Sequence, residues 1–256
     1  MELTRNAFKH GLAAPRAQVG LWSTLCSNIA AEVVADAGFD WILFDTEHSP
    51  NELPGLLAQL QAMGTSPTSP VVRVAWNDPV LIKRTLDLGV QSLLIPYVQN
   101  LEEARRAVAS VRYPPAGIRG VSAGSRASRY GRIPGYLSRA QDEICLLVQL
   151  ETRAALDPLE AIAGLEGIDG VFIGPADLAA SFGELGNPQA PLVQAAICEA
   201  AARLARVGKA AGILAVSEAD TARYLDWGYG FVAVGVDTQI LARGCESLVK
   251  RFKSAP

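Results

Sequence analysis

The chain has 256 residues, of which half are hydrophobic and 19% are charged. This apolar composition excludes an intrinsically disordered protein, and the net charge of −3 argues against a dedicated nucleic-acid binder. The sequence has no secretory signal pattern, and no stretch approaches the roughly 20 apolar residues of a membrane span. We therefore expect a cytoplasmic protein with no nucleic-acid or membrane partner.

Apolar segments of strand length alternate with segments of helical periodicity along the chain. The expected strands are residues 18–25, 39–45, 70–74, 92–96, 144–150, 170–173, 212–215 and 231–236. The expected helices are residues 28–37, 53–63, 79–88, 101–111, 155–163, 218–227 and 238–252, with an additional helix at 191–207. Eight buried strands that alternate with helices predict an α/β protein, a (β/α)₈ barrel.

We expect one domain over residues 1–256, because no linker, repeat or low-complexity segment divides the chain. The main alternative is a doubly wound open sheet. Its dinucleotide-binding form has no support, since no G-x-G-x-x-G motif follows the first strand.

The connection between the fourth and fifth strands, residues 112–143, is unusually long and contains six arginines. A loop of this length in a compact domain usually has a function or is held by a partner. It could bind an anionic part of a substrate, or it could pack against a neighbouring subunit.

Polar side chains are concentrated where the expected strands end, which is where barrel enzymes place their active sites. They are Asp45, Glu47 and His48 after the second strand, Arg73 in the third, Gln149 and Glu151 at the end of the fifth, Asp177 after the sixth and Asp237 after the eighth. The sequence therefore predicts that these groups converge at one end of the barrel.

Glu151 and Asp177 follow neighbouring strands, and two adjacent carboxylates repel unless a cation or a proton lies between them. A hard divalent ion suits this pair. The alternative is a structural one, an ion pair or a helix cap, because Asp177 also opens a helix.

Gly174, Pro175 and Ala176 turn the chain from the sixth strand into that helix. The free N–H groups of Ala176 and Asp177 could bind a substrate carboxylate or phosphate. An ordinary strand-to-helix turn is the other interpretation.

Arg73 lies among valines, so its guanidinium needs an anionic partner, either a structural carboxylate or a substrate oxyanion. His48 is close to Asp45 in sequence and could act as a general base near neutral pH, or it could simply be solvated. None of the five lysines lies within an expected strand, which disfavours a Schiff-base aldolase.

These residues belong to segments that resemble the HpcH/HpaI aldolases, the class II pyruvate aldolases that act on 4-hydroxy-2-oxoheptanedioate or 2-dehydro-3-deoxyglucarate. The resemblance covers nearly the whole chain. Its segments are GFDWILFDTEH, PVVRVAWNDP, RYPPAGIRGVS, LLVQLET, GVDT and GVFIGPADLA.

The resemblance implies a (β/α)₈ barrel, usually in a homohexamer whose last helix is exchanged between subunits. It implies that Glu151 and Asp177 bind Mg²⁺, Mn²⁺ or Co²⁺ and that Arg73 stabilises the transition state. His48 matches the base, with Asp87 rather than Asp45 as the carboxylate that raises its basicity. The positions that match substrate contacts are Gln149 and Ala176, and the apolar positions around the acceptor are Trp22, Leu214 and Val236. Thr46 departs from the glycine found in many relatives.

The expected activity is reversible cleavage of a 4-hydroxy-2-oxo acid into pyruvate and an aldehyde such as succinic semialdehyde. The alternatives are an aldolase for 2-keto-3-deoxy sugar acids, an acyl-CoA or citryl-type lyase, and a non-catalytic barrel that only binds a carboxylate. The sequence leaves the physiological aldehyde, the preferred metal and the stereochemistry at C4 open.

Overall fold

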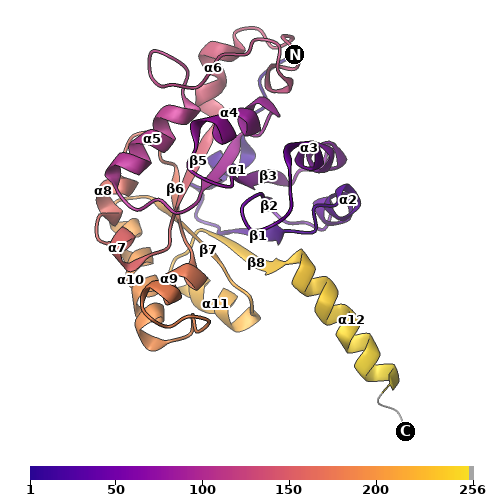
Figure 1. The fold of residues 1–256 in the computed structure, drawn as a ribbon, viewed down its shortest axis with the longest axis vertical. Coiled ribbons are helices and arrows are strands. Elements are labelled where there is room, and N and C mark those ends of the chain that lie inside the picture. The colour runs from indigo at the N-terminus through magenta and orange to yellow at the C-terminus, as the bar shows by residue number, and fades with distance from the viewer. Residues whose placement is uncertain (254–256) are drawn as a thin grey trace.

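The computed structural model describes residues 1–253 and shows a closed barrel of eight parallel strands (Figure 1). The strands are β1 (Gln18–Ser23), β2 (Trp41–Asp45), β3 (Ser69–Arg73), β4 (Ser92–Ile95), β5 (Cys145–Leu150), β6 (Gly170–Ile173), β7 (Ala210–Leu214) and β8 (Phe231–Val236). Each strand pairs with the next, and β1 pairs with β8, which closes the sheet. The predicted barrel is confirmed, and the open-sheet alternative is wrong.

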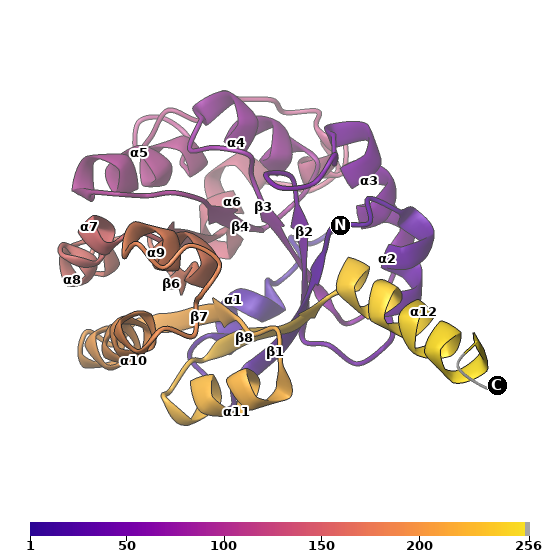
Figure 2. The ribbon, with the colours of Figure 1, turned by 60° about the horizontal axis from the view of Figure 1, so that its bottom comes forward.

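Helices surround the barrel, as Figure 2 shows from the end where α12 begins. They are α1 (Ala7–Gly11), α2 (Asn28–Ala35), α3 (Leu53–Ala62), α4 (Pro79–Asp87), α5 (Leu101–Val111), α6 (Tyr136–Glu143), α7 (Arg153–Leu156), α8 (Leu159–Ala163), α9 (Pro175–Ser181), α10 (Pro191–Arg206), α11 (Glu218–Asp226) and α12 (Asp237–Lys253). The helix expected at 155–163 is two short helices, because Pro158 interrupts it. No helix among residues 1–253 is long and apolar enough to cross a membrane.

The long connection at 112–143 is partly ordered by its own arginines. It contains a short 3₁₀ turn at Arg126–Ser128 and ends in α6. Arg119 is completely buried and donates to Asp87, while Arg126 donates to the backbone oxygen of Leu88. Three further arginines of the connection also have partners within the chain: Arg112 donates to Glu166, Arg132 donates to the backbone oxygen of Arg129, and Arg139 pairs with Glu2.

The helix α1, which the sequence analysis did not predict, closes the amino ends of the strands. Asn6, which caps it, donates to the backbone oxygens of Gln91 and Glu143, and Lys9 donates to that of Ile144. Above α1, an aromatic column fills the barrel interior, with ring centroids 5.5 to 6.1 Å apart along Phe8, Trp41, Phe231, Phe172 and Trp22.

The helix α12 leaves the barrel and projects into solvent (Figure 1). Asp237 fixes its first turn, because its carboxylate accepts hydrogen bonds from the side chain of Ser23 and from the backbone N–H groups of Thr24 and Leu25. From Gln239 to Lys253, every side chain is exposed.

Gly20 and Gly212 leave room for the aromatic column. A Cβ atom on Gly20 would lie 2.2 Å from the ring of Trp41, and one on Gly212 would lie 2.0 Å from the ring of Phe231.

We expect Gly20→Ala to lower the free energy of unfolding by about 1–3 kcal/mol through overpacking, measured by urea denaturation. Gly124→Ala is the control, because its Cβ would meet nothing within 4 Å. Equal stability of the two variants would contradict this account of the core.

Candidate active site

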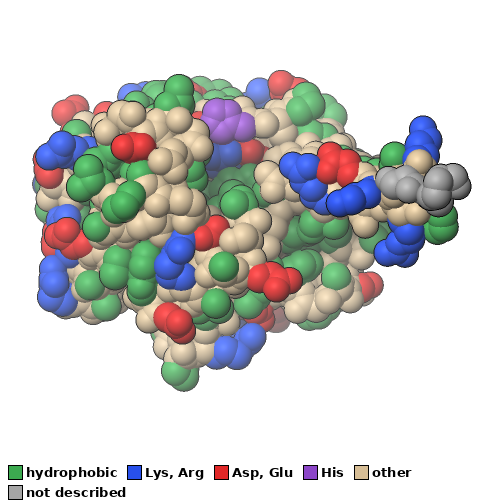
Figure 3. Space-filling view, turned by 90° about the horizontal axis from the view of Figure 1, so that it is seen from below, with side chains coloured by type: hydrophobic (Ala, Val, Ile, Leu, Met, Phe, Trp, Pro, Cys, Tyr) green, Lys and Arg blue, Asp and Glu red, His purple; other side chains and the backbone are tan. Residues whose placement is uncertain are grey.

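A cavity of about 160 Å³ opens at the carboxyl ends of the strands. Its lining consists of Trp22, His48, Arg73, Gln149, Phe172, Gly174, Pro175, Ala176, Asp177 and Leu214. Figure 3 shows the molecule from below the view of Figure 1, with a hollow that has apolar side chains at its base and a histidine, basic and acidic side chains at its edge. Most of the predicted site residues therefore meet at one place.

Arg73 is held by carboxylates of its own chain. Register places Asp45 on β2 beside Arg73 on β3, and Nε and Nη2 of Arg73 donate to the two Asp45 oxygens at 2.9 and 2.6 Å. Nη1 lies 2.8 Å from an oxygen of Glu47, and the guanidinium lies 4.7 Å from the Trp22 ring centroid. Burial acts to raise the pKa of Asp45, but the hydrogen bonds and charge of Arg73 outweigh it and lower this pKa. Arg73 therefore has structural carboxylate partners, and its contact with a substrate oxyanion stays a prediction.

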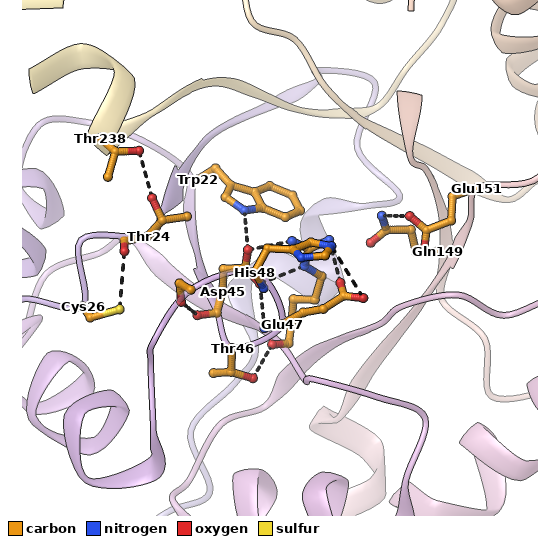
Figure 4. A network of polar contacts seen from close by, with 12 residues as sticks. Trp22, Thr24, Cys26, Asp45, Thr46, Glu47, His48, Gln149, Glu151 and Thr238 are labelled. Atoms are coloured by element: carbon orange, nitrogen blue, oxygen red, sulfur yellow. Dashed lines mark hydrogen bonds and ion pairs between the residues drawn. The ribbon is translucent and has the colours of Figure 1, made fainter. Parts of the chain in front are cut away.

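Asp45 also shapes the loop that presents His48 (Figure 4). Its Oδ1 accepts hydrogen bonds from the backbone N–H groups of Glu47 and His48, at 3.0 and 3.4 Å. Thr46 donates from its backbone N–H and its hydroxyl to the backbone oxygen of Arg73. The imidazole of His48 is 67% exposed, and its Nε2 lies 3.9 Å from Glu47. Asp45 therefore orients the backbone of this loop, and Glu47 is the carboxylate next to the imidazole.

Asp87 lies away from this loop. It is the last residue of α4, a helix that begins beyond the carboxyl end of β3 and returns toward the amino ends of the strands. Its carboxylate accepts a hydrogen bond from Arg119 at 3.1 Å. Within one chain the structure does not bring Asp87 to His48, so the role of Asp87 stays a prediction.

Glu151 is buried next to the cavity-lining residues Gln149 and Gly174, with a donor on each of its oxygens. Oε1 accepts from the backbone N–H of Tyr97, and Oε2 accepts from the amide of Gln149, both at 2.7 Å. Burial, together with the nearby charges of Asp177 and Glu47, raises the pKa of Glu151 to about 7, although the Tyr97 hydrogen bond acts to lower it. Glu151 and Asp177 therefore form a second group of acids, apart from the carboxylates of Asp45 and Glu47 that bind Arg73.

Gly174 allows the close packing at this side of the cavity. A Cβ atom there would lie 2.7 Å from Oε2 of Glu151 and 2.8 Å from the amide nitrogen of Gln149. Gly174 also caps α9 without a side-chain hydrogen bond, and Asp177 lies exposed in the first turn of that helix.

The donor set fits a hard divalent cation. Within residues 1–253 no group of three or more His, Cys, Asp or Glu side chains is placed to hold a metal by itself. Glu151 and Asp177 supply two carboxylates, and the buried Oε1 of Gln149 has no hydrogen-bond partner in the described part of the chain. Two carboxylates with water and substrate in the remaining positions are typical of Mg²⁺ sites.

The sequence analysis assigned no role to Phe172, Glu47 or Tyr97. Phe172 forms part of the cavity lining. Its position two residues before Gly174 could have indicated this, because residues two apart along a strand face the same side. Tyr97 contributes a backbone N–H, for which side-chain type gives no signal. Val236 is not part of the cavity lining; it packs in the interior cluster that contains Trp22.

The sequence profile of the HpcH/HpaI aldolase/citrate lyase family matches residues 18–244, and the chain belongs to this family. It is 61% identical to a pyruvate aldolase of Rhizobium etli over 98% of this chain and 99% of that protein. It is 58% identical to a 4-hydroxy-2-oxo-heptane-1,7-dioate aldolase of Klebsiella pneumoniae, covering 96% and 94% of the two chains.

Among solved structures, an HpcH/HpaI aldolase/citrate lyase family protein of Burkholderia cenocepacia superposes with a TM-score of 0.94 at 36% identity, covering 97% of this chain and 99% of that one. The expected family and its enzyme class, the aldolases among the carbon–carbon lyases, are confirmed.

Proposed function

We propose that the protein is a divalent-metal-dependent aldolase that reversibly cleaves 4-hydroxy-2-oxo acids, such as 4-hydroxy-2-oxoheptanedioate, to pyruvate and an aldehyde. The observation that carries the proposal is the pairing of a fixed guanidinium with a facing group of carboxylates around one small cavity. The names of the two relatives agree with this substrate class.

HpcH/HpaI aldolases generally depend on a divalent metal. Glu151 and Asp177 would hold it, and Mg²⁺, Mn²⁺ and Co²⁺ all suit oxygen ligands of this kind. When bound, the ion supplies Lewis acidity toward the 2-oxo and carboxylate oxygens of the substrate. The amide of Gln149 and the turn at Gly174, Pro175 and Ala176 would contact the pyruvate part.

The remaining residues of the site move the proton of the substrate hydroxyl group and stabilise the negative charge that develops. His48, exposed at the mouth of the cavity, removes the proton of the 4-hydroxyl group, and the C3–C4 bond then breaks. The electron pair of the O–H bond forms the aldehyde carbonyl, and that of the C3–C4 bond moves onto the pyruvate part as an enolate, whose negative charge Arg73 stabilises. A proton taken up at C3 then gives pyruvate and balances the one that was removed. Since Asp45 and Glu47 already fix the guanidinium, little reorganisation is needed as that charge develops. Trp22 and Leu214 form the apolar wall on the aldehyde side.

Metal removal tests the proposal directly. We expect EDTA-treated protein to release no pyruvate from 4-hydroxy-2-oxoheptanedioate and to regain activity on addition of Mg²⁺, Mn²⁺ or Co²⁺, measured by coupling to lactate dehydrogenase. The variant Glu151→Gln should stay inactive with every metal. Release that persists without metal would contradict the assignment of Glu151 and Asp177, whereas activity on sugar-acid substrates alone would move the assignment to the other aldolases of the family.

Arg73→Lys keeps the positive charge but loses the parallel hydrogen bonds to Asp45. We expect kcat to fall by about 100-fold or more, because the donors that face the developing charge are displaced. Arg203→Lys is the matched control: Arg203 pairs with both oxygens of Glu160 on the outer surface, away from the cavity. We expect Arg73→Lys to lose more stability in urea denaturation than Arg203→Lys, because its carboxylate partner is buried, and we expect kcat, measured on the folded proteins, to fall only for Arg73→Lys. Equal kcat values would contradict the role of Arg73.

We also propose that α12 packs on a second copy of the chain within a homohexamer. Its own barrel leaves more than half of the surface of its apolar side chains uncovered: Ile240, Leu241, Leu248, Val249 and Phe252 are 51 to 73% exposed. An exposed apolar stripe of this kind is typical of an interface. Ile29 and Val33 on α2 are 68 and 71% exposed. They form an apolar surface on which the α12 helix of a second copy could pack.

The double variant Leu248→Glu, Phe252→Glu tests this packing. We expect it to shift the molar mass, measured by light scattering after size exclusion, from a hexamer to smaller species, because two carboxylates would have to be buried at the interface. Lys250→Gln on the same helix is the control and should leave the mass unchanged. A wild-type monomer, or an unaffected double variant, would contradict the proposal.

A further inference from the structure

The segment between β4 and α5 lies against the end of β5, which contributes Glu151 to the site. Three consecutive residues of this segment bond to it. The N–H of Tyr97 donates to Oε1 of Glu151 at 2.7 Å, the N–H of Val98 donates to the backbone oxygen of Gln149 at 3.1 Å, and Gln99 accepts from the hydroxyl of Thr152. The segment is therefore fastened to β5 on both sides of the Glu151 carboxylate.

Tyr97 adopts a backbone conformation that side chains rarely take. Its φ is +53°, in the left-handed region, where Cβ crowds the following carbonyl oxygen. In this conformation two consecutive N–H groups both reach the end of β5, that of Tyr97 the Glu151 carboxylate and that of Val98 the backbone oxygen of Gln149. Strain of this kind persists where the surroundings compensate for it, and it is concentrated at functional sites.

A stacked aromatic pair supports the strained turn. The ring of Tyr97 lies 5.8 Å from that of Trp76, with an interplanar angle of 27°. Trp76 comes from the loop between β3 and α4, so the stack joins two neighbouring loops at the carboxyl end of the barrel. The two rings are 41 and 52% exposed, and neither forms part of the cavity lining. The stack thus lies outside the cavity that the substrate would enter.

We propose that the left-handed turn at Tyr97, held by the stack on Trp76, is a positioning device that fixes the Glu151 carboxylate for metal binding. Gln149 holds Oε2 from one side and the Tyr97 N–H holds Oε1 from the other, so the rotation of the carboxylate is fixed. Each oxygen keeps a further lone pair for a cation. Tyr97 is a positioning residue, and the inference depends on the proposed metal function.

Two substitutions separate the backbone from the ring. Both Tyr97→Gly and Tyr97→Val remove the ring, but glycine adopts a positive φ readily, whereas a β-branched residue does not. We expect Tyr97→Val to weaken Mn²⁺ binding to the full-length, metal-free protein by about 10- to 100-fold, the usual effect of losing a partner of a ligand. Tyr97→Gly should bind Mn²⁺ much more tightly than Tyr97→Val. Isothermal titration with Mn²⁺ alone measures both affinities.

Tyr130 provides a matched control. It is another exposed tyrosine with a positive φ, +58°, in the connection at 112–143 rather than next to β5. Tyr130→Val introduces the same backbone strain there, and we expect it to leave Mn²⁺ affinity unchanged. Thermal unfolding of all variants excludes loss of the folded state as the cause.

The outcomes distinguish this inference from the proposed function. Wild-type binding that Glu151→Gln abolishes, together with normal binding by Tyr97→Val, would overturn the inference alone. Equal weakening in Tyr97→Gly and Tyr97→Val would also overturn it, because the ring and not the turn would then be responsible. A wild-type protein that binds no Mn²⁺ would overturn the metal function and the inference with it.

Discussion

The site depends on a buried arginine at the end of an apolar barrel. A guanidinium that is removed from water requires anionic hydrogen-bond acceptors, and parallel pairing of β2 with β3 supplies the first of them, because the two strands end side by side at Asp45 and Arg73. The same carboxylate accepts from two backbone N–H groups of the following loop. One ion pair therefore fixes the guanidinium and presents Glu47 and His48.

Near Glu151 the situation is reversed, because negative charge there lacks a cationic partner. Glu151 is buried near Glu47 and Asp177 and has only neutral donors, the amide of Gln149 and the N–H of Tyr97. Mutual repulsion and burial favour a proton or a cation there. Arg73 is already matched by two carboxylates, and its charge offsets the repulsion at Glu151 only in part. A substrate whose oxo and carboxylate oxygens bind a cation near Glu151, and which develops negative charge near Arg73, is complementary to both sides.

Continuous apolar segments that alternate with helical periodicity were enough to predict the barrel, because buried parallel strands and amphipathic helices leave strong signals. The placement of Arg73, Gln149 and Asp177 at one end followed from strand order alone. The signals were absent where backbone groups or distant contacts decide the structure. The N–H of Tyr97 is independent of its side chain, α1 is held by contacts to strands more than 80 residues away, and the direction of Asp87 depends on its pairing with Arg119.

The core beneath the site is continuous with it. The aromatic column runs from Phe8, on the helix that closes the amino ends of the strands, to Trp22, which stacks on the guanidinium and donates to Asp45. Aromatic rings in a close-packed interior transmit displacement rather than absorb it. A change that moves Trp41 or Phe231 is therefore felt at Arg73. Gly20 and Gly212 leave room for these rings, so they shape the core on which Trp22 rests, while Asp45 holds the guanidinium directly.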